Sequence, residues 1–194
     1  MASSVIPEEP VAGRSRDQGC EVKRYRKIFI ACPISKYLID GGMDQEFAEF
    51  VRPIYHLCRD YARDVFFALE REKYGAAVMD GQTCTPLDYR AMIDADLILA
   101  IPEDSMGVAV ELGWASALNK DILLVLEEKY RYSPLISAIH SIAKARYINL
   151  PSHSRKSEIS GFLLPLLEEA LGGSASFSVT GSVESAGQPA AGSF

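Results

Sequence analysis

An apolar run that leads straight into a helix of small residues is the feature that most constrains this fold. Leu97–Ile101 has the composition of a buried strand. The chain then turns through residues 104–107 into a segment rich in Ala, Gly and Leu, which we expect to be helical over residues 107–118. A helix that follows a strand in this way presents its free N–H groups at the carboxyl edge of the sheet. Anions and small ligands bind at that edge in α/β proteins.

Short apolar runs and helical segments alternate along the rest of the chain. We expect strands over residues 28–32, 65–69, 96–101, 121–126 and 147–150, and helices over residues 45–62, 85–95, 107–118, 133–145 and 156–171. Strands that alternate with helices form parallel sheets with helices on both faces. The sequence therefore predicts an α/β fold: a single doubly wound, flavodoxin- or Rossmann-like sheet of five parallel strands with helices on both faces.

Capping residues and prolines indicate where the helices begin. Asp44 is expected to cap the helix over residues 45–62, and Pro53 should kink that helix or move its start. Thr85-Pro86 and Ser133-Pro134 each place a capping residue before a proline at the first helical position. The loop over residues 34–42 is long for a connection between a strand and a helix, which is typical of ligand binding.

Composition sets the domain organisation and excludes several functions. We expect a leader over residues 1–26, one catalytic domain over residues 27–171, and a disordered tail over residues 172–194 that carries a single charged residue, Glu184. The net charge of -6 argues against a nucleic-acid-binding protein. No apolar run approaches the roughly 20 residues that span a bilayer, and the N-terminus lacks a secretion signal. A cytoplasmic protein is therefore expected.

The cysteines and histidines are scattered and form no recognisable site. The chain has four cysteines and three histidines, without paired spacing: Cys20, Cys32, Cys58, Cys84, His56, His140 and His153. We therefore expect neither a zinc site nor a disulfide framework, and we expect reduced thiols. Cys32, at the end of a predicted strand, lacks the adjacent His or Lys that would activate a nucleophilic thiol.

A longer motif surrounds the junction between strand and helix. Residues 105–115 have the pattern Ser-x-Gly-x-x-x-Glu-Leu-Gly-x-Ala, and an Asp-Ala-Asp triplet precedes the strand. This combination resembles the nucleoside 2-deoxyribosyltransferase superfamily, and the resemblance covers residues 27–150. Three segments are similar to a narrower branch, the nucleotide N-glycosidases that cleave cytidylate or hydroxymethyl-cytidylate in nucleoside-antibiotic pathways. These segments are Ala68–Gly75, Leu87–Tyr89 and Glu111–Ser116.

Glu111 is the predicted catalytic nucleophile. The resemblance implies that this glutamate attacks the anomeric carbon C1′ of the substrate and forms a glycosyl-enzyme intermediate. Physical chemistry agrees, because an oxocarbenium-like transition state requires an anion beside C1′. A carboxylate nucleophile also divides one difficult displacement into two easier steps. The alternative is that Glu111 is a solvated charge on the surface of the helix.

Asp88 matches an acidic residue that the superfamily carries before the motif strand. The resemblance implies that this residue orients the ribose or the nucleophile, or manages the proton of the leaving base. The alternative is structural: Asp88 would complete a capping box with Thr85, a contribution of about 1 kcal/mol to stability.

Ser105 and Gly107 are the predicted phosphate-binding residues. They lie at the N-terminus of the expected helix, where a hydroxyl group and free N–H groups can hold an anion. The 5′-monophosphate glycosidases of the superfamily use a Ser-x-Gly at this place. Residues 135–139 resemble a segment of a related nucleotide hydrolase in which a serine reaches the phosphate from a neighbouring subunit. This implies a similar role for Ser137, which is otherwise an ordinary helix serine.

The loop after the first strand supplies further candidates for substrate binding. Ser35 and Lys36 lie where the cytidylate branch carries a basic residue near the substrate, although the spacing differs by one residue. A lysine supplies a point charge there, in place of the planar fork of an arginine. Tyr37 either stacks on the base or packs within the protein. Trp114, on the motif helix, is expected to pack against the sheet or a second subunit.

Together these residues predict a nucleotide N-glycosidase. Its substrate would be a nucleoside 5′-monophosphate, with cytidylate or a modified cytidylate as the favoured pyrimidine, and its products the free base and ribose 5-phosphate. No metal or organic cofactor is expected, because carboxylates and helix N–H groups supply the charge stabilisation. The alternatives are a deoxyribosyltransferase that exchanges one base for another and a nucleotide-binding sensor without turnover. The resemblance also implies a homodimer or a higher homo-oligomer with shared active sites.

Overall fold

The protein is built on a sheet of five parallel strands in the order β4-β1-β5-β6-β7. The computed structural model describes residues 23–39, 42–152 and 155–173. Most of the predicted leader and tail, residues 1–22 and 174–194, lies outside the described residues. The strands are β1 (Tyr25–Ala31), β4 (Ala62–Phe67), β5 (Leu97–Ala100), β6 (Asp121–Glu127) and β7 (Ala145–Leu150). The predicted doubly wound α/β fold is confirmed.

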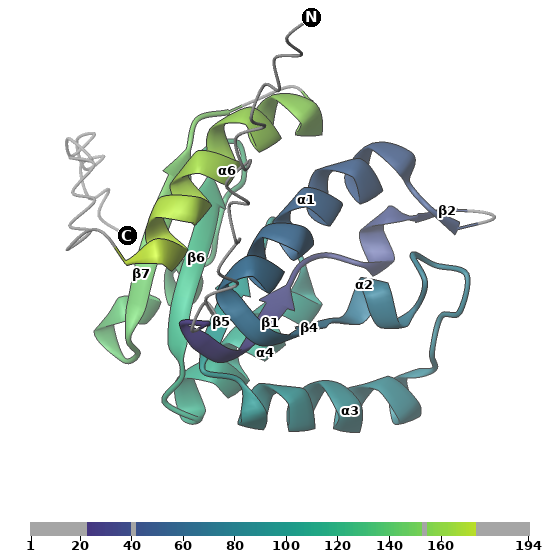
Figure 1. Ribbon diagram of the computed structural model, residues 1–194, viewed down its shortest axis with the longest axis horizontal. Helices are drawn as coiled ribbons and strands as arrows, with labels where there is room; N and C mark the ends of the chain where they lie inside the picture. The colour runs from purple at the N-terminus through teal and green to yellow at the C-terminus, as the bar shows by residue number, and fades with distance from the viewer. Residues whose placement is uncertain (1–22, 40–41, 153–154, 174–194) are drawn as a thin grey trace, which may run out of the picture.

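Helices cover both faces of this sheet (Figure 1). The long helices are α1 (Gln45–Tyr61), α3 (Gly81–Asp94), α4 (Met106–Ala117) and α6 (Lys156–Gly172). Alternate residues of β5 point to opposite faces: Leu97 and Leu99 pack in one core with α1 and α6, and Ile98 and Ala100 pack in another with α3 and α4. A strand buried on both faces must be apolar throughout, which explains the continuous apolar run seen in the sequence.

The direction of winding changes between β1 and β5. The strand that follows β1 in the main sheet, β4, lies on one side of it, whereas β5 and the later strands lie on the other. In doubly wound sheets, ligands bind outside the carboxyl ends of the strands at such a switch point. The loops over residues 32–37 and 101–105 flank this point, so the fold places the candidate substrate loops next to each other.

Shorter elements occupy the connections. The long loop predicted over residues 34–42 contains a 3-10 helix, η1, and a small antiparallel pair, β2-β3; residues 40–41 are outside the described part. The other short elements are helices. The bounds are η1 (Ser35–Tyr37), β2 (Leu38–Ile39), β3 (Gly42–Met43), α2 (Ala68–Arg71), α5 (Pro134–Ser137) and η2 (Ile139–Ser141).

Helix α3 begins at Gly81, so the start predicted at Thr85-Pro86 is wrong. Asp80 is the capping residue: its carboxylate accepts hydrogen bonds from the backbone N–H groups of Gln82 (2.9 Å) and Thr83 (3.1 Å). It also accepts a bond from the Thr83 hydroxyl (2.8 Å). These three bonds stabilise the earlier start, while Pro86 removes only one hydrogen bond within the helix. Asp88 therefore has no capping role with Thr85.

The helix predicted to run from Ser133-Pro134 to about Ala145 is also wrong in its length. Ser133 does cap α5, since its hydroxyl accepts a bond from the N–H of Leu135 (3.3 Å). The helix ends after one turn, and η2 follows. The hydroxyl of Tyr147, in β7, accepts a bond from the N–H of His140 (3.1 Å). Pairing of β7 with β6 begins at Ala145, and this pairing takes the residues that a longer helix would need.

Helix α1 begins where the sequence predicts, whereas strand β4 does not. Helix α1 keeps its predicted cap, because Asp44 accepts a bond from the N–H of Phe47 (2.8 Å), and the helix continues through Pro53 to Tyr61. Its start is therefore not moved by the proline. Strand β4 covers residues 62–67 instead of 65–69, since its pairing with β1 begins at Ala62 and α2 starts at Ala68.

Candidate active site

Glu111 lies inside helix α4 on the same face as Gly107, because residues four apart are neighbours on a helix surface. Its side chain is partly buried. Burial raises the pKa of the Glu111 carboxyl to about 8, and the negative charge of Asp88 adds to this effect. Glu111 is thus held in a low-dielectric site beside a second carboxyl group, which is typical of functional sites.

A thiol lies close to the same carboxyl group. Cys32, at the end of β1, is buried, and both its burial and the charge of Glu111 raise the pKa of the thiol well above its usual value. A thiol in this setting stays protonated and is a poor nucleophile. The structure therefore agrees with the expectation that Cys32 is not the nucleophile.

Asp88 belongs to a polar cluster with Arg71 and Glu72. The guanidinium group of Arg71 donates one hydrogen bond to Asp88 (2.5 Å) and another to Glu72 (2.8 Å). Burial raises the pKa of the Asp88 carboxyl despite the opposing hydrogen bond and charge of Arg71, and the charge of Glu72 raises it further. Arg71 and Glu72 belong to one of the segments that resemble the cytidylate branch, but the resemblance assigned no role to either residue. The structure shows that Arg71 holds both carboxylates.

A cavity of about 330 Å³ lies at the switch point of the sheet. Ser105, which lines this cavity, is the cap of α4, and its hydroxyl oxygen accepts a bond from the N–H of Val108 (3.4 Å). The cavity is lined by four of the predicted substrate-binding residues, together with Asp104 from the loop after β5 and Met106, the first residue of α4. The lining residues are Ser35, Lys36, Asp104, Ser105, Met106 and Gly107.

Lys36 supplies positive charge to this cavity. Its ammonium group is 2.7 Å from a carboxylate oxygen of Asp104 and 3.1 Å from one of Glu103. Burial lowers the pKa of Lys36, but the hydrogen bonds to these two carboxylates outweigh it and raise the pKa overall. Lys36 is therefore a permanent cation beside the N-terminus of α4, where an anion is favoured.

Two predicted residues stand apart from the cavity in this chain. The ring of Tyr37 stacks on Phe47 with 3.8 Å between ring centroids, and its hydroxyl donates to Glu103 (2.7 Å). Tyr37 thus has a packing role, and its contact with a base stays a prediction. Ser137 is exposed on α5 and is not among the residues that line the cavity. Its predicted contact would come from a second subunit.

Trp114 packs against the core of its own chain, which is one of the two positions predicted for it. Its ring is partly buried beside the core between α4 and the sheet. It meets the ring of Tyr89, on α3, edge to face with 5.3 Å between centroids. Trp114 therefore joins the two helices that carry Glu111 and Asp88.

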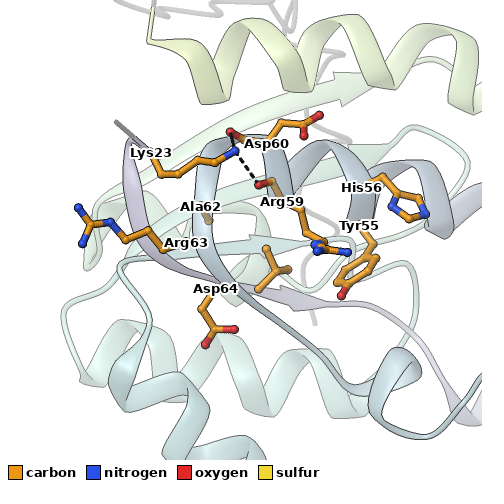
Figure 2. Close-up of a pocket in the computed structure, with 9 residues that line it drawn as sticks. Lys23, Tyr55, His56, Arg59, Asp60, Ala62, Arg63 and Asp64 are labelled. Carbon is orange, nitrogen blue, oxygen red and sulfur yellow. Dashed lines mark hydrogen bonds between the residues drawn. The ribbon is translucent and has the colours of Figure 1, made fainter. Parts of the chain in front are cut away.

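A larger cavity, of about 700 Å³, lies at the opposite edge of the sheet, where α1 ends and β4 begins (Figure 2). None of the predicted site residues lines it. The ammonium group of Lys23 donates to the carbonyl oxygens of Arg59 (3.2 Å) and Asp60 (2.7 Å) at the end of α1. This contact caps the helix, so Lys23 has a structural role.

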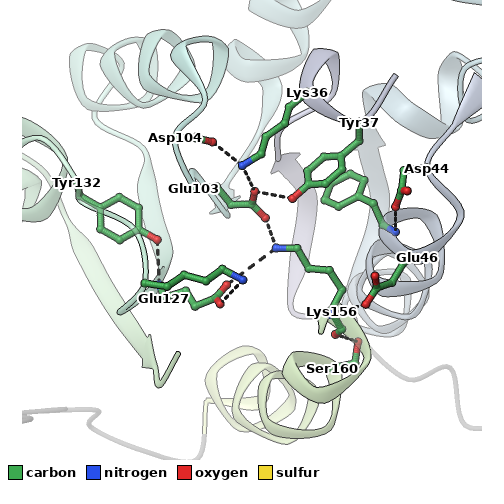
Figure 3. A network of polar contacts seen from close by, with 12 residues as sticks. Lys36, Tyr37, Asp44, Glu46, Glu103, Asp104, Glu127, Tyr132, Lys156 and Ser160 are labelled. Atoms are coloured by element: carbon green, nitrogen blue, oxygen red, sulfur yellow. Dashed lines mark hydrogen bonds and ion pairs between the residues drawn. The ribbon is translucent and has the colours of Figure 1, made fainter. Parts of the chain in front are cut away.

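A second polar network surrounds Glu103 (Figure 3). Sequence reasoning did not predict it. Glu103 contacts Lys36, Tyr37 and Lys156, and Lys156 also lies 3.9 Å from Glu127. The partners are up to 67 residues apart in the chain, so no local pattern indicates them. Only their shared position at the carboxyl edge of the sheet brings them together.

Within residues 23–39, 42–152 and 155–173, no group of three or more His, Cys, Asp or Glu side chains is arranged to hold a metal ion. No helix in this part of the chain is long and apolar enough to cross a membrane.

Comparison with known proteins finds similar solved structures. No protein-family model and no curated protein sequence matches the chain. The CMP N-glycosidase BcmB of Clostridium botulinum is 27% identical with a TM-score of 0.51, over 71% of this chain and 96% of BcmB. BlsM is 28% identical with a TM-score of 0.58, over 77% of this chain and 91% of BlsM. The chain is thus structurally similar to a CMP N-glycosidase and to BlsM, which confirms the resemblance to nucleoside 2-deoxyribosyltransferase-like proteins.

Proposed function

We propose that this protein hydrolyses the N-glycosidic bond of a nucleoside 5′-monophosphate, with cytidylate or a modified cytidylate as the favoured substrate. The observation that carries the proposal is the position of Glu111: a partly buried carboxyl group on the helix face that also carries Gly107, beside Asp88. The cavity with Ser105 and Lys36 would hold the phosphate. Similarity to a CMP N-glycosidase supports the choice of a cytosine nucleotide.

The reaction would proceed in two steps. The ionised Glu111 carboxylate attacks C1′ of the sugar, a C–O bond forms, and the bond between C1′ and the base nitrogen breaks. Asp88, in its protonated form, gives its proton to the departing base. A water molecule then attacks C1′ of the glycosyl ester and passes one proton back to Asp88. The products are the free base and ribose 5-phosphate, and Glu111 is ionised again.

A substrate panel tests this function directly. The protein is incubated with the ribo- and deoxyribonucleoside 5′-monophosphates and with the corresponding nucleosides, and the released base is followed by chromatography. We expect base release from a pyrimidine ribonucleotide. A deoxyribosyltransferase would form a new nucleoside when a 2′-deoxynucleoside and a different free base are mixed. Saturable nucleotide binding without base release would instead identify a sensor.

Replacing Ser105 by Asp is expected to remove the preference for phosphorylated substrates. Aspartate is as good a helix cap as serine, so α4 should keep its start. Its charge would, however, repel the phosphate at close range, and like charges in contact cost several kcal/mol. We expect kcat/KM for the nucleotide to fall by about 100-fold or more, while any activity on the nucleoside stays within a few-fold.

The neutral variant Ser105→Asn is the control for this experiment, because it also caps helices but adds no charge. Steady-state kinetics of both variants on a nucleotide and its nucleoside give the comparison. Equal losses on both substrates in Ser105→Asp would place the phosphate elsewhere.

We propose further that two copies of the chain associate through the exposed apolar residues of α4 and α5. Met106 is 82% exposed, Val110 52% and Leu135 85%. A Cβ atom at Gly113, which is on α4 like Met106 and Val110, would meet no atom within 4 Å, so this face of the helix is open. Burial of such side chains is favourable by about 25 cal/mol per Å². A second copy would also bring Ser137, on α5, to the site predicted by the resemblance.

Leu135→Asp should therefore convert a dimer or higher oligomer into a monomer. Size-exclusion chromatography with light scattering measures the mass of the wild type and the variant. Phe162→Asp is the matched control, since Phe162 is 55% exposed on α6, on the other face of the sheet. A monomeric wild type at the concentration of the activity assay would contradict this proposal.

A further inference from the structure

Glu103 is a buried carboxylate in a strained part of the backbone. It is 3% exposed, and its φ of 46° lies in the left-handed region that residues other than glycine rarely adopt. It belongs to the turn that joins β5 to α4, two residues before the Ser105 cap. A conformation of this kind persists only where the surrounding contacts hold it, and it is common at functional sites.

The contacts that hold Glu103 come from distant elements (Figure 3). One carboxylate oxygen pairs with the ammonium group of Lys156, the first residue of α6. The other accepts hydrogen bonds from the hydroxyl of Tyr37 (2.7 Å) and the ammonium group of Lys36 (3.1 Å). Glu103 therefore joins the loop after β1 to the turn after β5, and it fastens both to α6.

The charges in this network leave Lys36 suited to binding an anion. Burial raises the pKa of Glu103, but its bonds to Lys156, Tyr37 and Lys36 outweigh it and keep the carboxyl group ionised. Lys156 is buried and neutralises much of this charge. The other partner of Lys36, Asp104, has a side chain that is 63% exposed. An arriving phosphate would thus compete with an exposed carboxylate for Lys36, while Glu103 keeps the lysine in place.

We infer that Glu103 is a positioning residue for the substrate phosphate, which it serves by fixing Lys36 over the cavity beside Ser105 and Gly107. The inference rests on the proposed function and adds to it the residue that preorganises phosphate binding. Glu103 itself would not touch the phosphate, because a carboxylate and a phosphate are both anions and repel each other in contact. Its effect is to remove the cost of ordering Lys36 and the turn when the nucleotide binds.

The test compares Glu103→Gln with Glu127→Gln. Glu127 is the matched control, because it is also buried and lies near Lys156, whereas within the described part of the chain its ion pairs are with Lys129 and Lys156 and not with Lys36. We expect Glu103→Gln to raise KM for the nucleotide by about 10-fold or more, with kcat within about 3-fold. The affinity for ribose 5-phosphate, measured by calorimetry, should fall in proportion. Glu127→Gln should leave both quantities unchanged.

Tyr37→Phe provides a second, milder variant in case Glu103→Gln does not fold, which a thermal melt would reveal. It removes one hydrogen bond to Glu103 and leaves the ion pairs, so a smaller rise in KM and a smaller loss of ribose 5-phosphate affinity are expected. Unchanged KM in a folded Glu103→Gln protein, or equal effects in Glu127→Gln, would overturn the inference. So would wild-type protein that does not bind ribose 5-phosphate.

Binding of ribose 5-phosphate is measured without turnover, so it separates this inference from the proposed function. If the wild type releases no base but binds ribose 5-phosphate, and Glu103→Gln weakens that binding, the proposed hydrolysis fails and the positioning role stands. If the wild type releases base and Glu103→Gln binds ribose 5-phosphate as tightly, the positioning role fails and the hydrolysis stands.

Discussion

Replacing Glu111 by Gln is expected to reduce base release by at least about 10³-fold, because glutamine cannot form the glycosyl ester on which the reaction depends. The amide has nearly the same shape as the carboxyl group, so the fold and nucleotide binding should persist. Turnover is measured by chromatography of the released base, and binding by calorimetry with the same nucleotide. A variant within a few-fold of the wild type would refute the role of Glu111 as nucleophile.

The same substitution should make the protein more stable at high pH. The pKa of Glu111 in the folded protein is about 8, above its ordinary value of 4.5. The folded state therefore holds a proton that the unfolded state releases between these values, and wild-type stability falls as the pH rises through this window. The loss from one such group is at most about 1.4 kcal/mol per pH unit. Glutamine does not titrate, so the variant keeps this stability.

Urea unfolding at pH 5 and at pH 8 measures the effect. We expect Glu111→Gln to be close to the wild type at pH 5 and more stable than the wild type at pH 8. Asp104→Asn is a control, because Asp104 is exposed and the pKa of its carboxyl is lowered by the hydrogen bond from Lys36. A difference between Glu111→Gln and the wild type that is the same at both pH values would show that Glu111 is ionised in the folded protein.

The fold could be predicted because its determinants are local. Strands buried on both faces require continuous apolar runs such as Leu97–Ile101. The cap at Asp44 and the proline after Ser133 each indicated a helix start that the structure contains. The sequence predicted a start for α3 at Thr85, but the helix begins after Asp80, because the Asp80 carboxylate accepts bonds from two N–H groups in the folded chain. Those bonds are seen only in the geometry.

The site could be predicted only in part, for the same reason. Glu111, Ser105 and Gly107 share one helix, so their relation follows from helical spacing. The bond between Arg71 and Asp88 joins α2 to α3, and the pair of Glu103 and Lys156 joins residues 53 apart. No periodicity or turn pattern encodes such pairs. They arise because the parallel strands end at a common edge, where buried charges must find partners.

Replacing Asp88 by Asn is expected to lower the maximal rate by about 10²-fold, the usual contribution of a general acid. It should also move the pH dependence of kcat/KM. Attack requires an ionised Glu111 and a protonated Asp88, so the two carboxyl groups must hold one proton between them. The wild type should therefore lose kcat/KM as the pH rises through about 8, where this proton leaves the pair. In Asp88→Asn only Glu111 titrates, and its pKa is lower without the charge of Asp88, although burial still raises it. The remaining activity of the variant should therefore rise with pH and stay constant above that pKa.

The control for this experiment is Glu72→Gln, because Glu72 is the other carboxylate bound to Arg71. The charged and titratable groups around the pair are Arg71 and Glu72 beside Asp88, and Cys32 beside Glu111. Cys32 stays protonated and adds no charge. Glu72→Gln keeps Asp88, so its activity should also fall at high pH, near the pH at which the wild type loses activity. A lower melting temperature in Asp88→Asn, with unchanged turnover and an unchanged pH profile, would mean that Asp88 serves stability alone. A pH profile that moves only when Asp88 is replaced would mean that its charge acts directly on the nucleophile.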